Sequence, residues 1–176
     1  MKSTLNPFLI NTGFLFNQPI GYSRVIPFEM EEIDLGDGLV IAQLSGTIEL
    51  VRNQDGFRSQ ADFSGLIDNE CGRCLEPYQG QVHSQFEEFF TFPFIAASED
   101  EMQVPENGNV DFLPILHDYI LMELPISPVC KPDCKGLCDI CGVNRNLKDC
   151  GHTHSNEDEE KAFQLDLESL KKTLDT

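Results

Sequence analysis

Seven cysteines and one histidine stand in short clusters that are typical of metal-binding turns. Two residues separate Cys71 from Cys74 and Cys138 from Cys141, while Cys130 and Cys134 have a slightly longer gap. Such spacing lets two thiolates reach one ion from a tight turn, and a tetrahedral zinc ion takes four ligands of this kind. The candidate metal ligands are Cys71, Cys74, Cys130, Cys134, Cys138, Cys141, Cys150 and His152.

These eight residues divide most simply into two sets of four, which predicts one or two structural zinc ions. The first set joins cysteines that are distant in sequence: Cys71, Cys74, Cys130 and Cys134. The second set is local and forms a ribbon: Cys138, Cys141, Cys150 and His152. An alternative is a single local site that leaves Cys71 and Cys74 as a free dithiol: Cys130, Cys134, Cys138 and Cys141. Spacing leaves this pairing open, and His154 is an alternative to His152 as the eighth ligand.

The ligand number favours a structural role for the metal over a catalytic one. A catalytic zinc ion keeps one coordination position open for water, whereas four protein ligands close the shell. The sequence also contains no G-x-S-x-G, H-E-x-x-H, Walker A or G-x-G-x-x-G motif, so we expect no enzyme. A redox role for Cys71 and Cys74 is a competing hypothesis, but a β-hairpin lacks the helix N-terminus that lowers a thiol pKa.

Alternating apolar and polar residues predict an antiparallel, hairpin-rich sheet that positions the cysteines. The turn residues Asn53–Gly56 predict the first hairpin, and Pro77–Gly80 predicts the turn before the third strand. The predicted strands cover residues 38–51, 57–67 and 82–92, with an edge strand over residues 23–33.

Helical periodicity follows the strands and completes a predicted α+β fold. Asp111 can cap a helix that covers one face of the sheet, and the last residues predict an amphipathic C-terminal helix. The predicted segments are a β-rich part of the core (1–95), an acidic linker (96–109), a core helix (110–129), a cysteine-rich zinc ribbon (130–154) and the C-terminal helix (155–176).

Composition limits the classes of partner. The 176 residues include 30 acidic and 12 basic side chains, and the formal charge of −18 disfavours broad electrostatic binding to nucleic acid and favours cationic polypeptides. No apolar stretch approaches the ~20 residues of a membrane helix, and no secretory signal is visible, so we expect a cytoplasmic protein. Against this acidic background, the weak candidates for RNA or partner contact are Arg73, Lys131, Lys135, Arg145 and Lys148.

Three segments together resemble the YceD family, the large ribosomal RNA subunit accumulation proteins: Cys71–Pro77, Leu124–Cys130 and Cys134–Asn144. The usual family pattern closes with Cys-x-Cys, whereas His152 stands at the second position here and remains a competent zinc ligand. The resemblance implies a non-enzymatic role in the accumulation of large-subunit ribosomal RNA. Combined with the acidic charge, it predicts an adaptor for a basic ribosomal protein or an assembly intermediate. A thiol redox protein or chaperone and a direct RNA-binding module are the alternatives.

Overall fold

A computed structural model describes residues 6–95 and 102–152 of the chain. Its contacts divide the chain into two compact units: a sheet unit (residues 1–72 and 76–132) and a knuckle unit (residues 73–75 and 133–176). The helices and strands of the described residues all fall in the sheet unit. They are β1 (Leu9–Asn11), the short 3₁₀ helix η1 (Gly13–Asn17), β2 (Ser23–Asp34), β3 (Val40–Arg52), β4 (Gly56–Glu70), β5 (Pro77–Thr91), β6 (Met102–Gln103), β7 (Asn109–Asp111) and α1 (Leu113–Glu123).

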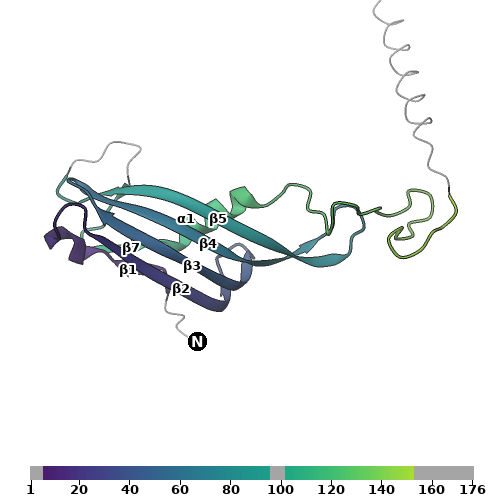
Figure 1. The fold of residues 1–176 in the computed structure, drawn as a ribbon, viewed down its shortest axis with the longest axis horizontal. Helices are drawn as coiled ribbons and strands as arrows, with labels where there is room; N and C mark the ends of the chain where they lie inside the picture. Colours follow the sequence, from purple (N-terminus) through teal and green to yellow (C-terminus); the bar gives the residue numbers. More distant parts are fainter. Residues whose placement is uncertain (1–5, 96–101, 153–176) are drawn as a thin grey trace, which may run out of the picture. The chain divides into compact units, whose positions relative to one another are not determined.

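The predicted antiparallel strands are confirmed. β2, β3, β4 and β5 pair in sequence order and lie side by side in Figure 1, and the short β6 adds to β5 in parallel. Ile48 of β3 lies opposite Ile26 of β2 and Ala61 of β4, and Ala61 lies opposite Phe86 of β5. This row crosses four strands on one face, because successive side chains of a strand alternate between the two faces of a sheet.

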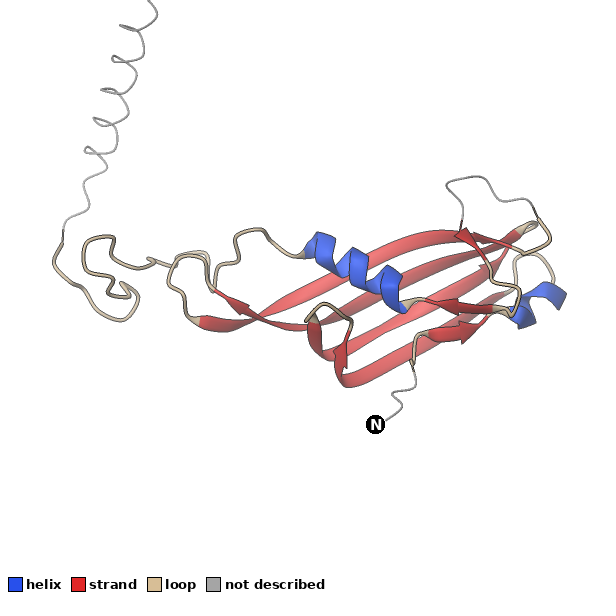
Figure 2. Ribbon diagram, turned by 180° about the vertical axis from the view of Figure 1, so that it is seen from behind, coloured by secondary structure: helices blue, strands red, loops and turns tan. Residues whose placement is uncertain are grey.

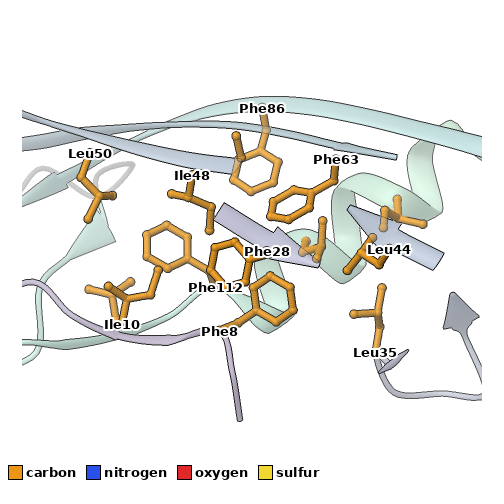
Figure 3. Packing of buried hydrophobic residues seen from close by; sticks show 14 of the residues in the cluster. Phe8, Ile10, Phe28, Leu35, Leu44, Ile48, Leu50, Phe63, Phe86 and Phe112 are labelled. Carbon is orange, nitrogen blue, oxygen red and sulfur yellow. The ribbon is translucent and has the colours of Figure 1, made fainter. Parts of the chain in front are cut away.

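Aromatic rings fill the space beneath that face. Phe8, which precedes β1, stacks on Phe28 of β2 with ring centroids 4.7 Å apart, and it meets the edge of Phe63 of β4 at 5.7 Å. Phe112, just before α1, meets Phe90 of β5 at 5.5 Å. Figure 3 shows Phe8, Phe28, Phe63 and Phe112 converging in this core. Burial of such large apolar rings makes a large contribution to the free energy that stabilises the sheet unit.

The predicted covering helix is confirmed as α1. The carboxylate of Asp111 accepts the backbone N–H of Leu113 at 2.9 Å, which satisfies one donor of the first turn. Leu116 and Ile120 are buried on the face that packs against the sheet. Figure 2 shows α1 and the β1–β7 pair on the same face of the five-stranded sheet.

The turn predicted at Pro77–Gly80 is wrong. β5 already begins at Pro77, which lies opposite Glu70 of β4, and Gly80 lies opposite Ile67. The connection between β4 and β5 is closed before Pro77, where the backbone N–H of Cys71 donates to the carbonyl of Glu76 at 3.0 Å. The cysteine turn is therefore the connection between β4 and β5, and strand pairing resumes directly after it.

Two predicted segments fall wholly or partly on residues that the structure does not describe. The helix predicted over residues 155–176 lies outside the described residues. The acidic linker predicted over residues 96–109 is described from residue 102 onward, where it contains β6 and Val104. Val104 is only 1% exposed, and its N–H donates to the carbonyl of Thr91 at 2.9 Å. This part of the segment is attached to the sheet, because the free energy gained by burying the side chain of Val104 exceeds the tendency of the acidic neighbours to stay in water.

Candidate metal centre

The first cysteine turn presents two buried thiols at the end of the β4–β5 hairpin. Cys71 is fully buried and Cys74 is 4% exposed. The backbone N–H of Gly72 in this turn donates to the carbonyl of Pro128 at 2.8 Å. That hydrogen bond holds the segment after α1 against the turn, and this segment ends at Cys130. Partial loss of solvent raises the pKa of Tyr78, and the thiolate charges of Cys71 and Cys130 raise it further.

The knuckle unit is built on a short antiparallel pairing around Leu137 and Asn144. The N–H of Cys138 donates to the carbonyl of Val143 at 2.8 Å, and that of Arg145 donates to the carbonyl of Gly136 at 2.9 Å. On the other side, Leu137 donates its N–H to the carbonyl of Arg73 at 2.9 Å.

A side-chain contact of Arg73 completes this arrangement. Its guanidinium donates to the carbonyl of Cys134 at 3.2 Å. Together with the Leu137 bond, this contact brings Cys134 beside the Arg73–Leu75 segment, which contains Cys74.

The structure brings the first predicted set of ligands together. The four sulfur atoms lie within 4.8 Å of one another and belong to Cys71, Cys74, Cys130 and Cys134. A tetrahedral ion with metal–sulfur bonds of about 2.3 Å requires sulfur atoms roughly 3.8 Å apart, so small side-chain adjustments suffice. Cys130 and Cys134 thus lie with the first cysteine turn, as in the two-set division, and not with Cys138 and Cys141.

The second predicted set is also brought together, in the knuckle unit. Its ligand atoms lie within 4.8 Å of one another and belong to Cys138, Cys141, Cys150 and His152. The turn closes where the N–H of Gly142 donates to the carbonyl of Cys138 at 2.7 Å. The sulfur of Cys138 lies 3.6 Å from Nδ1 of His152. That separation matches the roughly 3.6 Å expected between a thiolate and an imidazole nitrogen on one tetrahedral zinc ion. His154 lies outside the described residues.

Hydrogen bonding stabilises the thiolate of Cys138. Burial acts to raise the pKa of this thiol, but the backbone N–H groups of Cys141 and Ile140 and the thiols of Cys141 and Cys150 donate to its sulfur and lower the pKa to about 5. The N–H of Val143 acts to lower the pKa of Cys141, but the hydrogen bonds with Cys138 and Cys150, burial and the charge of Cys138 together raise that pKa. A thiolate held in this way is a ready metal ligand.

The donor chemistry of both groups fits a soft metal ion. None of the seven cysteines forms a disulfide bond. One group offers four sulfur atoms and the other offers three sulfur atoms and one imidazole nitrogen. Both are sets that tetrahedral zinc takes. The two groups could therefore each hold one metal ion with a closed shell of four protein ligands.

The basic residues that the sequence suggested for RNA or partner contact are divided between the two units. Arg73, Lys135, Arg145 and Lys148 belong to the knuckle unit, whereas Lys131 belongs to the sheet unit. Arg73 is exposed but uses its guanidinium to hold the carbonyl of Cys134, and Arg145 is half-buried. Lys135 and Lys148 are exposed. Their role in contact stays a prediction.

Asn146 is a site residue that sequence reasoning missed. Its side-chain amide donates to the sulfur of Cys134 at 3.3 Å and to Oδ1 of Asn144 at 2.9 Å. An amide inside a cysteine-rich loop is the only sequence signal for this role, because which sulfur it reaches depends on how the loop folds back. Donors to ligand sulfur atoms orient the ligands of a metal site.

No helix among the described residues is long and apolar enough to cross a membrane.

Comparison with known proteins places the chain in a family. Residues 60–172, which include both ligand groups, match the YceD family, described as large ribosomal RNA subunit accumulation protein YceD. An uncharacterized protein of Mycobacterium tuberculosis and one of Mycobacterium bovis are each 40% identical over 93 residues, which cover 51% of this chain and 44% of the relative. An uncharacterized protein of Mycobacterium leprae is 32% identical over 132 residues, which cover 70% of this chain and 60% of the relative.

The chain thus spans about half the length of the curated relatives it matches. No solved structure matches it. The family match covers more than half of the chain and includes every cysteine of the two ligand groups, and on this basis the chain belongs to the YceD family.

Proposed function

We propose that this protein is a zinc-binding factor without catalytic activity that supports the accumulation of large-subunit ribosomal RNA through a basic protein partner. Family membership supplies the process. The observation that carries the zinc assignment is the gathering of eight ligands into two closed sets of four. Structural zinc sites have four protein ligands, whereas a hydrolytic site leaves one position for water.

Zinc in these groups would stabilise the chain directly. Metal binding to ligands that are unordered in the unfolded chain contributes to the free energy of folding. The Cys138 group lies in the knuckle unit, where no helix or strand longer than a single bridge is described. A unit with so little regular backbone pairing depends on its metal, as small metal-binding domains generally do.

The proposed partner surface is the face of the five-stranded sheet opposite the aromatic core. No described element covers this face. Glu49 of β3 lies beside Gln60 of β4, which lies beside Glu87 of β5, and these residues line a shallow hollow of 490 Å³ together with Asp62. Glu29 of β2 adds a further carboxylate on the same face. Such a surface attracts lysine and arginine side chains.

Two of these carboxylates are available to a partner. Glu87 pairs with Arg58 at 3.2 Å, and Asp62 lies 3.0 Å from the imidazole of His83. Among the described residues, Glu29 and Glu49 have no cationic partner of this kind. A cationic segment on this face would therefore gain new ion pairs without breaking existing ones.

Direct RNA binding is the less favoured reading, because the charge of the knuckle unit does not support it. Its described part contains four cations (Arg73, Lys135, Arg145 and Lys148) and three carboxylates (Asp133, Asp139 and Asp149). A divalent ion held by three thiolates and a neutral imidazole adds one net negative charge. The small excess of cations is thereby cancelled, whereas RNA binding needs a sustained positive surface.

A redox role is less favoured because of burial. Cys71 and Cys74 are at most 4% exposed and lie in a group of four sulfur atoms. Reactive cysteines are generally accessible to their substrates.

The first experiment measures zinc in the purified, reduced chain by elemental analysis and counts free thiols before and after chelation. Two zinc ions per chain with masked thiols support the proposal. No zinc, together with a peroxide-induced mass shift that reverses on reduction, supports the redox alternative instead.

The partner is tested with purified large-subunit ribosomal proteins and ribosomal RNA. The double variant Glu29→Lys/Glu49→Lys should lose binding to the basic proteins and lower the ratio of large- to small-subunit RNA in complemented cells. The control Glu106→Lys/Glu123→Lys makes the same charge change at exposed residues away from this face. Equal loss in both variants would overturn the proposed surface, and salt-sensitive RNA binding lost in Arg145→Ala would favour the RNA alternative.

A further inference from the structure

The side chain of Asn146 is held in one orientation by several polar contacts within the knuckle unit. Its Oδ1 accepts the backbone N–H of Lys135 at 2.9 Å. An oxygen at that position leaves the amide nitrogen facing the sulfur of Cys134 at 3.3 Å and Oδ1 of Asn144 at 2.9 Å. The backbone N–H of Asn146 also donates to Oδ1 of Asn144 at 3.0 Å. These hydrogen-bond partners thus determine which position of the amide is the oxygen and which is the nitrogen.

This N–H donor fits the metal-binding form of Cys134. Cysteine binds metal as a thiolate, and a hydrogen bond to a charged sulfur is stronger than one to a neutral thiol. The contact therefore favours the thiolate and holds the sulfur in place. Outer contacts of this kind commonly change metal affinity by about 10–100-fold.

The loop that carries Asn146 belongs to the second ligand group. Asn146 lies between Cys141 and Cys150, which are both ligands of that group. The loop is closed upon itself, because the N–H groups of Leu147 and Lys148 donate to the carbonyl of Asn144, each at 3.1 Å. A metal ion bound by Cys141 and Cys150 would hold both ends of this loop. The donor to a ligand of the first group is thus positioned by ligands of the second.

We propose that Asn146 is a positioning residue that couples the two metal groups. Its amide orients the Cys134 thiolate, and metal in the Cys138–Cys141–Cys150–His152 group holds the loop that carries this amide. Metal in the second group therefore strengthens metal binding in the first, and by thermodynamic linkage the effect is mutual. This inference rests on the proposed zinc binding.

The test compares Asn146→Ala and Asn146→Asp with Leu147→Ala, a control at a 79% exposed side chain in the same loop. The full-length zinc-loaded chain is titrated with a chelator, and alkylation of each cysteine is followed by mass spectrometry. In Asn146→Ala we expect about 10–100-fold weaker zinc binding by the first group and faster alkylation of Cys134. Asn146→Asp should be weaker still, because it places a carboxylate beside the thiolate. Leu147→Ala should match the unmodified chain.

Coupling is tested by removing a ligand of the second group. Cys150→Ser should weaken zinc binding by Cys71, Cys74, Cys130 and Cys134, and adding Asn146→Ala should weaken it little further, because both changes act through the same contact. Circular dichroism of the sheet verifies that each variant is folded. Unchanged alkylation of Cys134 in Asn146→Ala, or fully additive effects, would overturn the coupling while leaving zinc binding intact. An unmodified chain without zinc would overturn the proposed function itself.

Discussion

Leu75 and Gly142 occupy the same position in the two cysteine turns, and both have a positive φ angle. Each follows the second cysteine of a Cys-x-x-Cys pair, and their φ angles are 57° and 70°. Glycine adopts this left-handed conformation without steric cost, whereas a leucine is strained by its Cβ. The turn geometry is therefore imposed by the positions of the cysteines, and Leu75 adopts it in spite of its side chain.

Exchanging these residue types should change stability in opposite directions. Leu75→Gly relieves a strain of about 1–2 kcal/mol, partly offset by the greater freedom of glycine in the unfolded chain. We expect a net gain of about 0.5–1 kcal/mol. Gly142→Ala should cost about 1 kcal/mol, because it introduces the same strain. Thermal unfolding of the zinc-loaded variants measures both, and a loss of stability in Leu75→Gly would contradict this account.

The pairing of cysteines can be read from single substitutions. Cys71→Ser should remove one zinc ion and expose Cys74, Cys130 and Cys134 to alkylation, while Cys141→Ser should expose Cys138 and Cys150. Each substitution should release the ion of its own set, because the ligand atoms form two separate groups, while the other set keeps its ion and binds it more weakly. Elemental analysis with mass spectrometry of alkylated chains checks this. Unchanged zinc content in Cys71→Ser would instead indicate the single local site.

The hydrogen bond between Tyr119 of α1 and Glu88 of β5 should make stability dependent on alkaline pH. The hydroxyl donates to Oε1 of Glu88 at 2.7 Å. This bond raises the pKa of Tyr119, as do burial and the charge of Glu88. A raised pKa in the folded state means that the contribution is complete below the ordinary tyrosine value of 10.0 and is lost as pH rises through the folded-state pKa.

Tyr119→Phe removes this bond and should lower the free energy of unfolding by about 1–2 kcal/mol at neutral pH. Denaturant unfolding between neutral pH and pH values above 10 measures the effect. The variant should lose less stability than the unmodified chain on the alkaline side. Parallel pH profiles for the two proteins would show that the hydrogen bond does not stabilise the fold.

Phe63 and Phe89 provide a matched comparison of the two faces of the sheet. Phe63 is 1% exposed in the aromatic core, whereas Phe89 is 50% exposed on the opposite face. Phe63→Ala should cost about 3–5 kcal/mol, because it leaves a cavity among packed rings. Phe89→Ala should cost less than about 1 kcal/mol. Denaturant unfolding checks both values, and similar costs would mean that the core is not centred on Phe63.

The strands and the helix were predictable because their signals are local. Period-two alternation around Ile48, Phe63 and Phe86 placed the strands, and the apolar stripe with Leu116 and Ile120 placed α1. The turn at Pro77–Gly80 was misplaced for the same reason. Proline and glycine are local turn signals, and the hydrogen bond from Cys71 to Glu76 that closes the actual turn has no such signal.

The sequence by itself determined which residues could bind metal, because cysteine spacing within a turn is a property of neighbouring residues. Only the tertiary structure decided how the clusters combine. Cys130 approaches Cys71 through the bond from Gly72 to Pro128, and Cys134 approaches Cys74 through the bond from Leu137 to Arg73. These contacts join segments that are far apart in the chain, and no local pattern encodes them. The donation from Asn146 to Cys134 depends in the same way on a loop that must first fold back, so only the folded chain reveals it.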